Sequence, residues 1–215
     1  MTERVVVLGA GGHAKMCLEV LRAQGRFEPL GILDPDPPQP SVLGCPVIGA
    51  DDMLPILRRD GIGLCFLALG GNALRARKIT LVRQLGFRIA TIIHPSAVIL
   101  ASAWIGDGVA VMPRAVVGAE ARVEAAAIIN TGAVIEHDCI VGTAAHIAPG
   151  VTLAGAVHVG ARALIGVGSS VRPSVTVGED AVVGVGAAVV ADVAPGCVVG
   201  GVPARHLRVR GKGAH

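Results

Sequence analysis

The chain has 215 residues, a length that suits one compact domain together with a smaller one. Its formal net charge of +3 is modest and no basic stretch is interleaved with aromatic residues, so nucleic-acid binding is not indicated. Hydrophobic residues make up 52% of the chain, yet no apolar run is long enough for a membrane span, and glycines interrupt the N-terminal apolar stretch too early for a signal peptide. The five cysteines are scattered and odd in number, which favours buried thiols in a reducing cytoplasm.

Predicted strands and helices alternate through the first ninety residues. We expect strands at 4–8, 29–34 and 64–69, and helices at 14–23, 51–59 and 72–84. A glycine loop follows the first strand, and a stiff proline-rich loop, residues 35–40, follows the second. Strands that alternate with helices predict a parallel sheet, so residues 1–90 are expected to form a small Rossmann-like unit.

The glycine loop and the acid that ends the second strand together suggest a nucleotide site. Gly9-Ala-Gly-Gly-His13, with Asp34 about twenty residues on, matches a dinucleotide fingerprint, so an NAD-dependent enzyme is one alternative. The unit is only one mononucleotide half, however, and a dinucleotide normally spans two. A mononucleotide or nucleoside-diphosphate ligand fits better, because the glycines allow close approach and the next helix N-terminus favours a phosphate. His13 could add a donor and Asp34 could bind a base or ribose; a tight turn without a ligand is the other alternative.

An aliphatic residue returns at every sixth position from Ile93 to Val189, and a small or short-branched residue stands four places after each. This period fits neither a helix nor an alternating strand and is typical of a parallel β-helix of hexapeptides. Three hexapeptides make one triangular coil, so successive coils stack at about 4.8 Å. Residues 91–215 are therefore predicted to form a β-helix with a C-terminal cap, its aliphatic residues pointing inward.

One stretch of the β-helix interrupts the otherwise unreactive exposed positions. Its polar residues are Asn130, Glu136, His137, Asp138 and His146. An imidazole beside a carboxylate is the minimal oriented general base, since the acid can fix the tautomer and raise the basicity. Stacking places Gly155 one coil beyond His137, where its backbone N–H could stabilise a developing oxyanion.

At these residues the chain resembles a known family. The hexapeptide array, the 9–13 loop, the 130–138 run and the terminal Gly201-Val-Pro-Ala-Arg205 resemble sugar O-acyltransferases of the sialic acid O-acetyltransferase type. The resemblance is strongest to the bacterial branch of nucleotide-sugar N-acetyltransferases, which acetylate UDP- or GDP-linked 4-amino-4,6-dideoxysugars. It covers essentially the whole chain and implies a left-handed β-helix, a cytoplasmic homotrimer, and acetyl-CoA bound in the cleft between neighbouring helices, with no metal.

The resemblance also implies roles for individual residues. It makes His137 the general base and Asp138 the residue that orients it. The residues expected near acetyl-CoA are His146, Gly155, Val167 and Val185. Those expected to bind the nucleotide sugar are Gly11, Gly12, His13, Asp34 and Gly70 at the nucleotide, and Asn130 and Glu136 at the sugar. The uridine-binding members carry two consecutive acids after the second strand, whereas Pro35 follows Asp34 here, so the choice between uracil and guanine stays open.

Three further alternatives remain at this point. The same machinery could O-acetylate sialic acid or another sugar hydroxyl. A γ-type carbonic anhydrase-like metal protein could use His137, His146 and His158, but their spacings place them on different edges of the prism. A non-catalytic assembly solenoid would leave the confined polar cluster unexplained. For the acetyltransferase we expect direct transfer, because the only nearby thiol, Cys139, falls at an inward-facing position.

Overall fold

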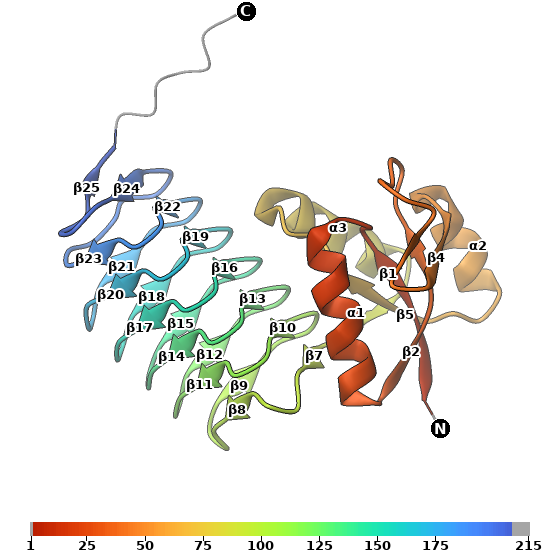
Figure 1. The fold of residues 1–215 in the computed structure, drawn as a ribbon, viewed down its shortest axis with the longest axis horizontal. Coiled ribbons are helices and arrows are strands. Elements are labelled where there is room, and N and C mark those ends of the chain that lie inside the picture. Colours follow the sequence, from red (N-terminus) through yellow and green to blue (C-terminus); the bar gives the residue numbers. More distant parts are fainter. Residues whose placement is uncertain (1, 208–215) are drawn as a thin grey trace, which may run out of the picture.

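The computed structural model describes residues 2–207, which form two units lying side by side (Figure 1). The first unit, coloured red to yellow, holds the long helices and one sheet. The second, coloured green to blue, is a β-helix whose early coils lie beside the first unit. The prediction of a Rossmann-like unit followed by a hexapeptide β-helix is confirmed.

The sheet of the first unit has six strands in the order β3-β4-β2-β1-β5-β6. They are β1 (Glu3–Leu8), β2 (Phe27–Leu33), β3 (Ser41–Val42), β4 (Cys45–Gly49), β5 (Leu64–Leu67) and β6 (Arg88–Ile89). Only the β3–β4 pair is antiparallel. The chain runs from β1 to β2 on one side and later to β5 on the other, so the carboxyl end of β1 is a topological switch point, where open α/β sheets bind ligands.

Helices cover both faces of this sheet. Helix α1 (Gly12–Gln24) packs on one face, and η1 (Asp51–Met53), α2 (Leu54–Arg59) and α3 (Asn72–Gln84) lie on the other. Helix α1 ends at Gly25, whose left-handed φ of 66° suits a glycine. The predicted helices and main strands all form. The β3–β4 hairpin follows the predicted 35–40 loop and adds two strands that the sequence analysis did not expect.

The β-helix consists of three sheets, here called the first, second and third. The first contains β7 (Ile92–Ile93), β10 (Ala110–Val111), β13 (Ile128–Ile129), β16 (His146–Ile147), β19 (Leu164–Ile165), β22 (Val182–Val183), β24 (Val198–Gly200) and the antiparallel β25 (Arg205–His206). The second contains β8 (Val98–Ile99), β11 (Val116–Val117), β14 (Val134–Ile135), β17 (Thr152–Leu153), β20 (Ser170–Val171) and β23 (Ala188–Val189). The third contains β9 (Trp104–Ile105), β12 (Arg122–Val123), β15 (Ile140–Val141), β18 (His158–Val159) and β21 (Thr176–Val177).

The sixfold pattern explains this prism directly. From Val111 onward, the aliphatic residues of the repeat are buried inside the prism together with the small residues four places later. Corner 1–2 joins the first sheet to the second, corner 2–3 joins the second to the third, and corner 3–1 leads back to the first. Many corners contain a residue with positive φ, such as Asp138 (60°) and Ala144 (54°). Such a conformation is uncommon for residues other than glycine, and aspartate tolerates it better than most.

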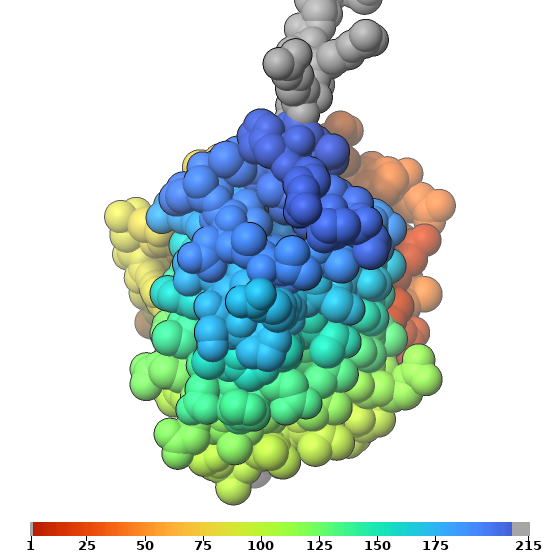
Figure 2. All heavy atoms as spheres, turned by 90° about the vertical axis from the view of Figure 1, so that its left-hand side faces the viewer, coloured from red at the N-terminus to blue at the C-terminus, as the bar shows by residue number. Residues whose placement is uncertain are grey.

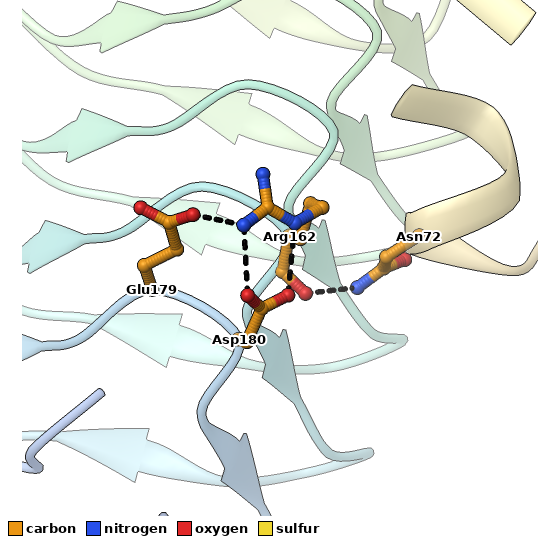
Figure 3. Close-up of polar contacts among 4 residues, drawn as sticks. All are labelled: Asn72, Arg162, Glu179 and Asp180. Atoms are coloured by element: carbon orange, nitrogen blue, oxygen red, sulfur yellow. Dashed lines mark hydrogen bonds and ion pairs between the residues drawn. The ribbon is translucent and has the colours of Figure 1, made fainter. Parts of the chain in front are cut away.

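Helices α1 and α3 both dock the first unit onto the β-helix. Helix α1 packs against the outward residues Ile92, Ala110 and Ile128 of the first sheet, and these residues share one buried cluster. Helix α3 meets corner 3–1, where the Asn72 side-chain amide donates to the carbonyl of Arg162 at 2.8 Å (Figure 3).

The Arg162 side chain is held in turn by two acids of the next coil. Its guanidinium bonds both carboxylate oxygens of Asp180, at 2.9 and 2.7 Å, and also pairs with Glu179 (Figure 3). These bonds raise the pKa of Arg162, so the guanidinium at the corner that receives α3 stays positively charged.

The side of the prism opposite the first sheet carries no part of the first unit. Figure 2 looks at the molecule from the left of Figure 1, and stacked coils cover the view from yellow-green to blue, with the first unit visible only at the margins. Corner 2–3, which is opposite the first sheet, is therefore open to solvent in a single chain. Within residues 2–207, no helix combines the length and the apolar character needed to cross a bilayer.

Candidate active site

The exposed corner 2–3 carries an imidazole–carboxylate pair. His137 Nδ1 lies 2.7 Å from Asp138 Oδ2, and the two side chains are 62% and 59% exposed. A carboxylate only accepts hydrogen bonds, so Nδ1 carries the proton and donates it to Asp138. The lone pair of the neutral ring then lies on Nε2, which is the arrangement of a general base. The left-handed conformation of Asp138 places its side chain next to the preceding histidine.

Gly155 stacks directly on this imidazole, as the coil arithmetic predicts. A Cβ at Gly155 would lie 2.5 Å from both Cε1 and Nε2 of His137, so only glycine leaves room for the ring. Within residues 2–207, the Gly155 N–H donates to no backbone carbonyl, although its carbonyl accepts from Ser174 at 3.0 Å. A free amide next to Nε2 is suited to bind an oxyanion.

Cys139 is buried inside the prism, as predicted. Its thiol contacts the carbonyl of Ala154 at 3.2 Å, and burial raises its pKa. A buried neutral thiol is a poor nucleophile. Glu136 precedes His137 on the same corner and is exposed.

His146 lies elsewhere, on the outer surface of the first sheet. Its Nε2 is 3.0 Å from Nδ2 of Asn130, and its ring centroid is 6.4 Å from that of His13 at the start of α1. The first sheet is opposite corner 2–3, so the structure does not bring His146 together with His137 in one chain. The sequence analysis grouped Asn130, His137 and His146 on one coil and expected the two histidines on different edges of the prism, and the structure places them on different edges because each coil wraps around the prism.

Both histidines at the junction of the two units are neutral near pH 7. Burial, followed by the charge of Arg75, lowers the pKa of His13 to about 4. Burial, Arg75 and His13, in that order, lower the pKa of His146 to about 4. The Nε2 atom of His13 is buried and has no hydrogen-bond partner among the described residues. An unpaired buried polar atom carries a free-energy cost that a bound ligand can remove.

The predicted nucleotide residues gather at the switch point. Gly11 and Gly12 are exposed at the start of α1, and a Cβ on Gly70 would lie 3.9 Å from the Cβ of His13. Asp34 closes β2 with one carboxylate oxygen accepting the Ala10 N–H at 2.7 Å and the other accepting the Asp36 N–H at 3.0 Å. Asp34 thereby fixes the backbone of the glycine loop.

A cavity of about 130 Å³ opens beside this loop. Its walls include Lys15 from α1, Gln39 from the proline-rich loop and Ser41 from β3. The sequence analysis missed these three residues. Lys15 could have been found from the sequence, because it stands two places after His13 in the first turns of α1. Gln39 and Ser41 could not, because nothing in the sequence indicated that the β3–β4 hairpin closes the other wall.

Val167 and Val185 lie on corner 1–2, in consecutive coils, and are 46% and 77% exposed. Exposed valines form an apolar strip on the β-helix surface.

Of the three histidines of the metal alternative, His137 is on corner 2–3, His146 on the first sheet and His158 on the third. Within residues 2–207, no three His, Cys, Asp or Glu side chains gather closely enough to hold a metal ion.

The chain is similar to known proteins over both units. A family model described as the PglD N-terminal domain matches residues 4–82. A perosamine N-acetyltransferase from Caulobacter crescentus, solved with CoA and GDP-perosamine, is 45% identical, with 96% of this chain and 98% of that chain covered and a TM-score of 0.92. The same enzyme has been solved with one histidine replaced by asparagine or by alanine.

A second similar structure is the acetyltransferase domain of PglB from Neisseria gonorrhoeae, solved alone and with acetyl coenzyme A. It is 37% identical, with 96% of this chain and 100% of that chain covered and a TM-score of 0.91. WeeI from Acinetobacter baumannii is 25% identical over 96% of this chain, with a TM-score of 0.83. No curated protein matches.

Proposed function

Because the chain belongs to the family of bacterial nucleotide-sugar N-acetyltransferases, we propose that it transfers the acetyl group of acetyl-CoA to the C4 amine of a nucleotide-linked 4-amino-4,6-dideoxysugar. GDP-perosamine is the first candidate substrate. The observation that carries the proposal is the 45% identity, over nearly the whole chain, to an enzyme solved with CoA and GDP-perosamine. The His137–Asp138 pair on Gly155 supplies the chemistry that this reaction needs.

The proposed mechanism is direct transfer. The sugar amine nitrogen attacks the thioester carbonyl, and Nε2 of His137 takes the proton that the nitrogen loses. Asp138 stabilises the imidazolium through its bond to Nδ1. The Gly155 N–H donates to the oxyanion of the tetrahedral intermediate, which collapses as the C–S bond breaks, and the thiolate of CoA takes up the proton from the His137 imidazolium. General-base assistance of this kind contributes about 10²–10⁴-fold.

The nucleotide diphosphate is proposed to bind at the switch point of the first unit. Gly11 and Gly12 leave the backbone open to a phosphate at the N-terminus of α1, and Lys15 adds a positive charge. His13 and Asn130 lie between this loop and the first sheet, where they would contact the sugar. Residues 1–90 and 91–215 are proposed as the two functional divisions, and the change from the first unit's sheet at β6 to the prism at β7 supports this boundary.

We also propose a homotrimer in which neighbouring chains complete each site. The nucleotide loop and His137 lie on opposite sides of one prism, so a sugar anchored on one chain would reach the base of a neighbour. The exposed strip of Val167 and Val185 would then line the groove for acetyl-CoA between chains, with Glu136 and His146 approaching the reacting groups from different chains.

A complementation experiment tests the shared site. At a nucleotide-sugar concentration well below the raised KM of Asp34→Ala, the His137→Ala and Asp34→Ala substitutions each inactivate a different half of the site, and mixed trimers are prepared by co-expression with two tags. Random assortment of equal amounts pairs an intact base with an intact nucleotide half in about one site in four, so activity returns. If each chain carried its own complete site, mixing would restore nothing.

Steady-state kinetics test the reaction itself. We expect acetylation of a GDP- or UDP-linked 4-amino sugar, followed as release of the CoA thiol. His13→Ala and Asp34→Ala should raise KM for that substrate and leave KM for acetyl-CoA unchanged, because they remove binding remote from the reacting atom. If a free sugar or sialic acid were acetylated as well as any nucleotide-linked sugar, O-acetylation of a hydroxyl would replace this proposal.

A further inference from the structure

The most deeply buried charge in the described residues belongs to Arg75, in the middle of the junction between the two units. Arg75 projects from α3 and is only 1% exposed. All three of its guanidinium nitrogens are engaged, and every acceptor is a neutral oxygen. The acceptors are the carbonyls of Ala126 (2.7 Å), Leu69 (2.7 Å), Gly70 (3.1 Å), Ala144 (2.8 Å) and Ala145 (3.4 Å) and the side-chain oxygen of Asn72 (3.0 Å).

These acceptors belong to two segments whose relative position matters for the reaction, the loop after β5 and corner 3–1 of the β-helix. Leu69 and Gly70 form the loop after β5, and Gly70 lies against His13. Ala126 and Ala144 are the left-handed residues of corner 3–1 in consecutive coils. They bracket the one coil that carries Asn130 on one side and His137 on the other.

We propose that Arg75 is a positioning residue for the nucleotide sugar: it fastens the loop at Gly70, and with it His13, to the coil that carries Asn130 and His137. The inference rests on the proposed function for the identity of the ligand. Arg75 itself is covered by protein and touches no substrate. Its effect passes through the loop and through the imidazoles beside it.

The charge of Arg75 supports this role. Burial lowers its pKa to about 10, so it remains a cation at neutral pH, and no carboxylate among the described residues bonds to it. The titratable groups that face this junction are His13 and Cys17 from α1 and His146 from the first sheet. The Cys17 thiol is neutral because burial raises its pKa, and burial and the Arg75 charge keep both imidazoles neutral. The nucleotide diphosphate would therefore bring negative charge to a site beside a cation that bonds to no carboxylate among the described residues.

Lysine cannot replace this arginine fully. A guanidinium offers five N–H donors in a fixed fork, whereas an ammonium group offers three donors around one point. Arg75→Lys therefore keeps the charge and loses part of the bonding. Arg75→Met loses both, and the pair of variants separates the two contributions.

The experiment compares Arg75→Met, Arg75→Lys and, as a matched control on the exposed face of the same helix, Arg77→Met. KM for the nucleotide sugar, KM for acetyl-CoA and kcat are measured, together with the Kd for GDP and UDP by calorimetry. For Arg75→Met we expect the sugar KM to rise about tenfold or more, since several buried hydrogen bonds are lost. Acetyl-CoA KM should stay near wild type. Arg75→Lys should show a smaller rise, and Arg77→Met none.

NMR titration of the imidazoles gives a readout that does not depend on turnover. In wild type and Arg75→Lys, His13 and His146 should stay neutral down to about pH 5, whereas in Arg75→Met their pKa values should rise part of the way toward 6.5, because the repelling charge is gone while burial, the larger cause, remains. If Arg75→Met does not fold, the positioning role is tested by Arg75→Lys alone, which should still raise KM for the nucleotide sugar.

An unchanged sugar KM in Arg75→Lys and Arg75→Met, or an equal rise in both KM values with unshifted imidazoles, would overturn the positioning role. Failure of wild type to acetylate any nucleotide sugar would count against the proposed function instead, while the imidazole titration would still test the electrostatic part of this inference.

Discussion

Replacing Gly155 by alanine should disable the enzyme through a single methyl group. The new Cβ would lie 2.5 Å from Cε1 and Nε2 of His137, whereas carbon atoms in contact stay about 3.5–4.0 Å apart. The ring must therefore withdraw by about 1 Å, and its bond of 2.7 Å to Asp138 must tilt or break. A displacement of about 1 Å in a catalytic group costs about 100-fold in rate, or about 2.7 kcal/mol in the activation barrier.

The assay is initial-rate release of the CoA thiol at saturating acetyl-CoA and nucleotide sugar. Because alanine keeps the backbone N–H, a loss in Gly155→Ala reports the imidazole and not the oxyanion donor. Gly63→Ala is the control, since a Cβ there meets nothing within 4 Å. We expect kcat to fall toward the level of His137→Ala with KM for the nucleotide sugar little changed. A Gly155→Ala enzyme with full kcat would refute the placement of His137 as the base.

Four other variants test neighbouring parts of the reasoning. His137→Ala should lower kcat by about 10²-fold or more while acetyl-CoA still binds, and Asp138→Asn should lose less because the imidazole remains; near-normal turnover in His137→Ala would contradict the base assignment. Cys139→Ala should keep near-wild-type turnover, and a trappable acyl-cysteine in wild type would overturn direct transfer. Because the folded pKa of His13 is about 4, below its unfolded value near 6.5, folding stability should fall as the pH drops from about 6.5 toward 4. His13→Asn should make the melting temperature depend less steeply on pH over that range, with the remaining slope due to His146, whose pKa is also about 4; an unaltered slope would mean that His13 is not buried as a neutral group.

The sequence predicted the β-helix and one of its key contacts because both follow from periodicity. A residue every sixth position fixes which side chains point inward, and adding one coil to His137 leads to Gly155, which indeed lies on the ring. The glycine loop and Asp34 were predictable for a similar reason, since a parallel sheet brings the carboxyl ends of β1 and β2 to one edge.

Arg75 could not be recognised in the same way. In the helix 72–84 it stands among Arg77, Lys78 and Arg83, a pattern typical of a solvated basic face. Only the docking of α3 onto corner 3–1 buries it. The same limit applies to Gln39 and Ser41, whose place in the cavity depends on the β3–β4 hairpin folding back beside the loop.

The spacing of His137 and His146 along the chain also predicted that they lie on different edges of the prism, for a geometric reason. In a helix, residues a few positions apart share a face, but in a triangular coil nine residues cover half of the circuit. His137 therefore lies on the open corner 2–3, while His146 faces His13 under the first unit. A base on one side of the prism and a nucleotide site on the other could not act on one substrate molecule in an isolated chain. They make sense in the proposed homotrimer, where the nucleotide site of each subunit would face the open corner of the next.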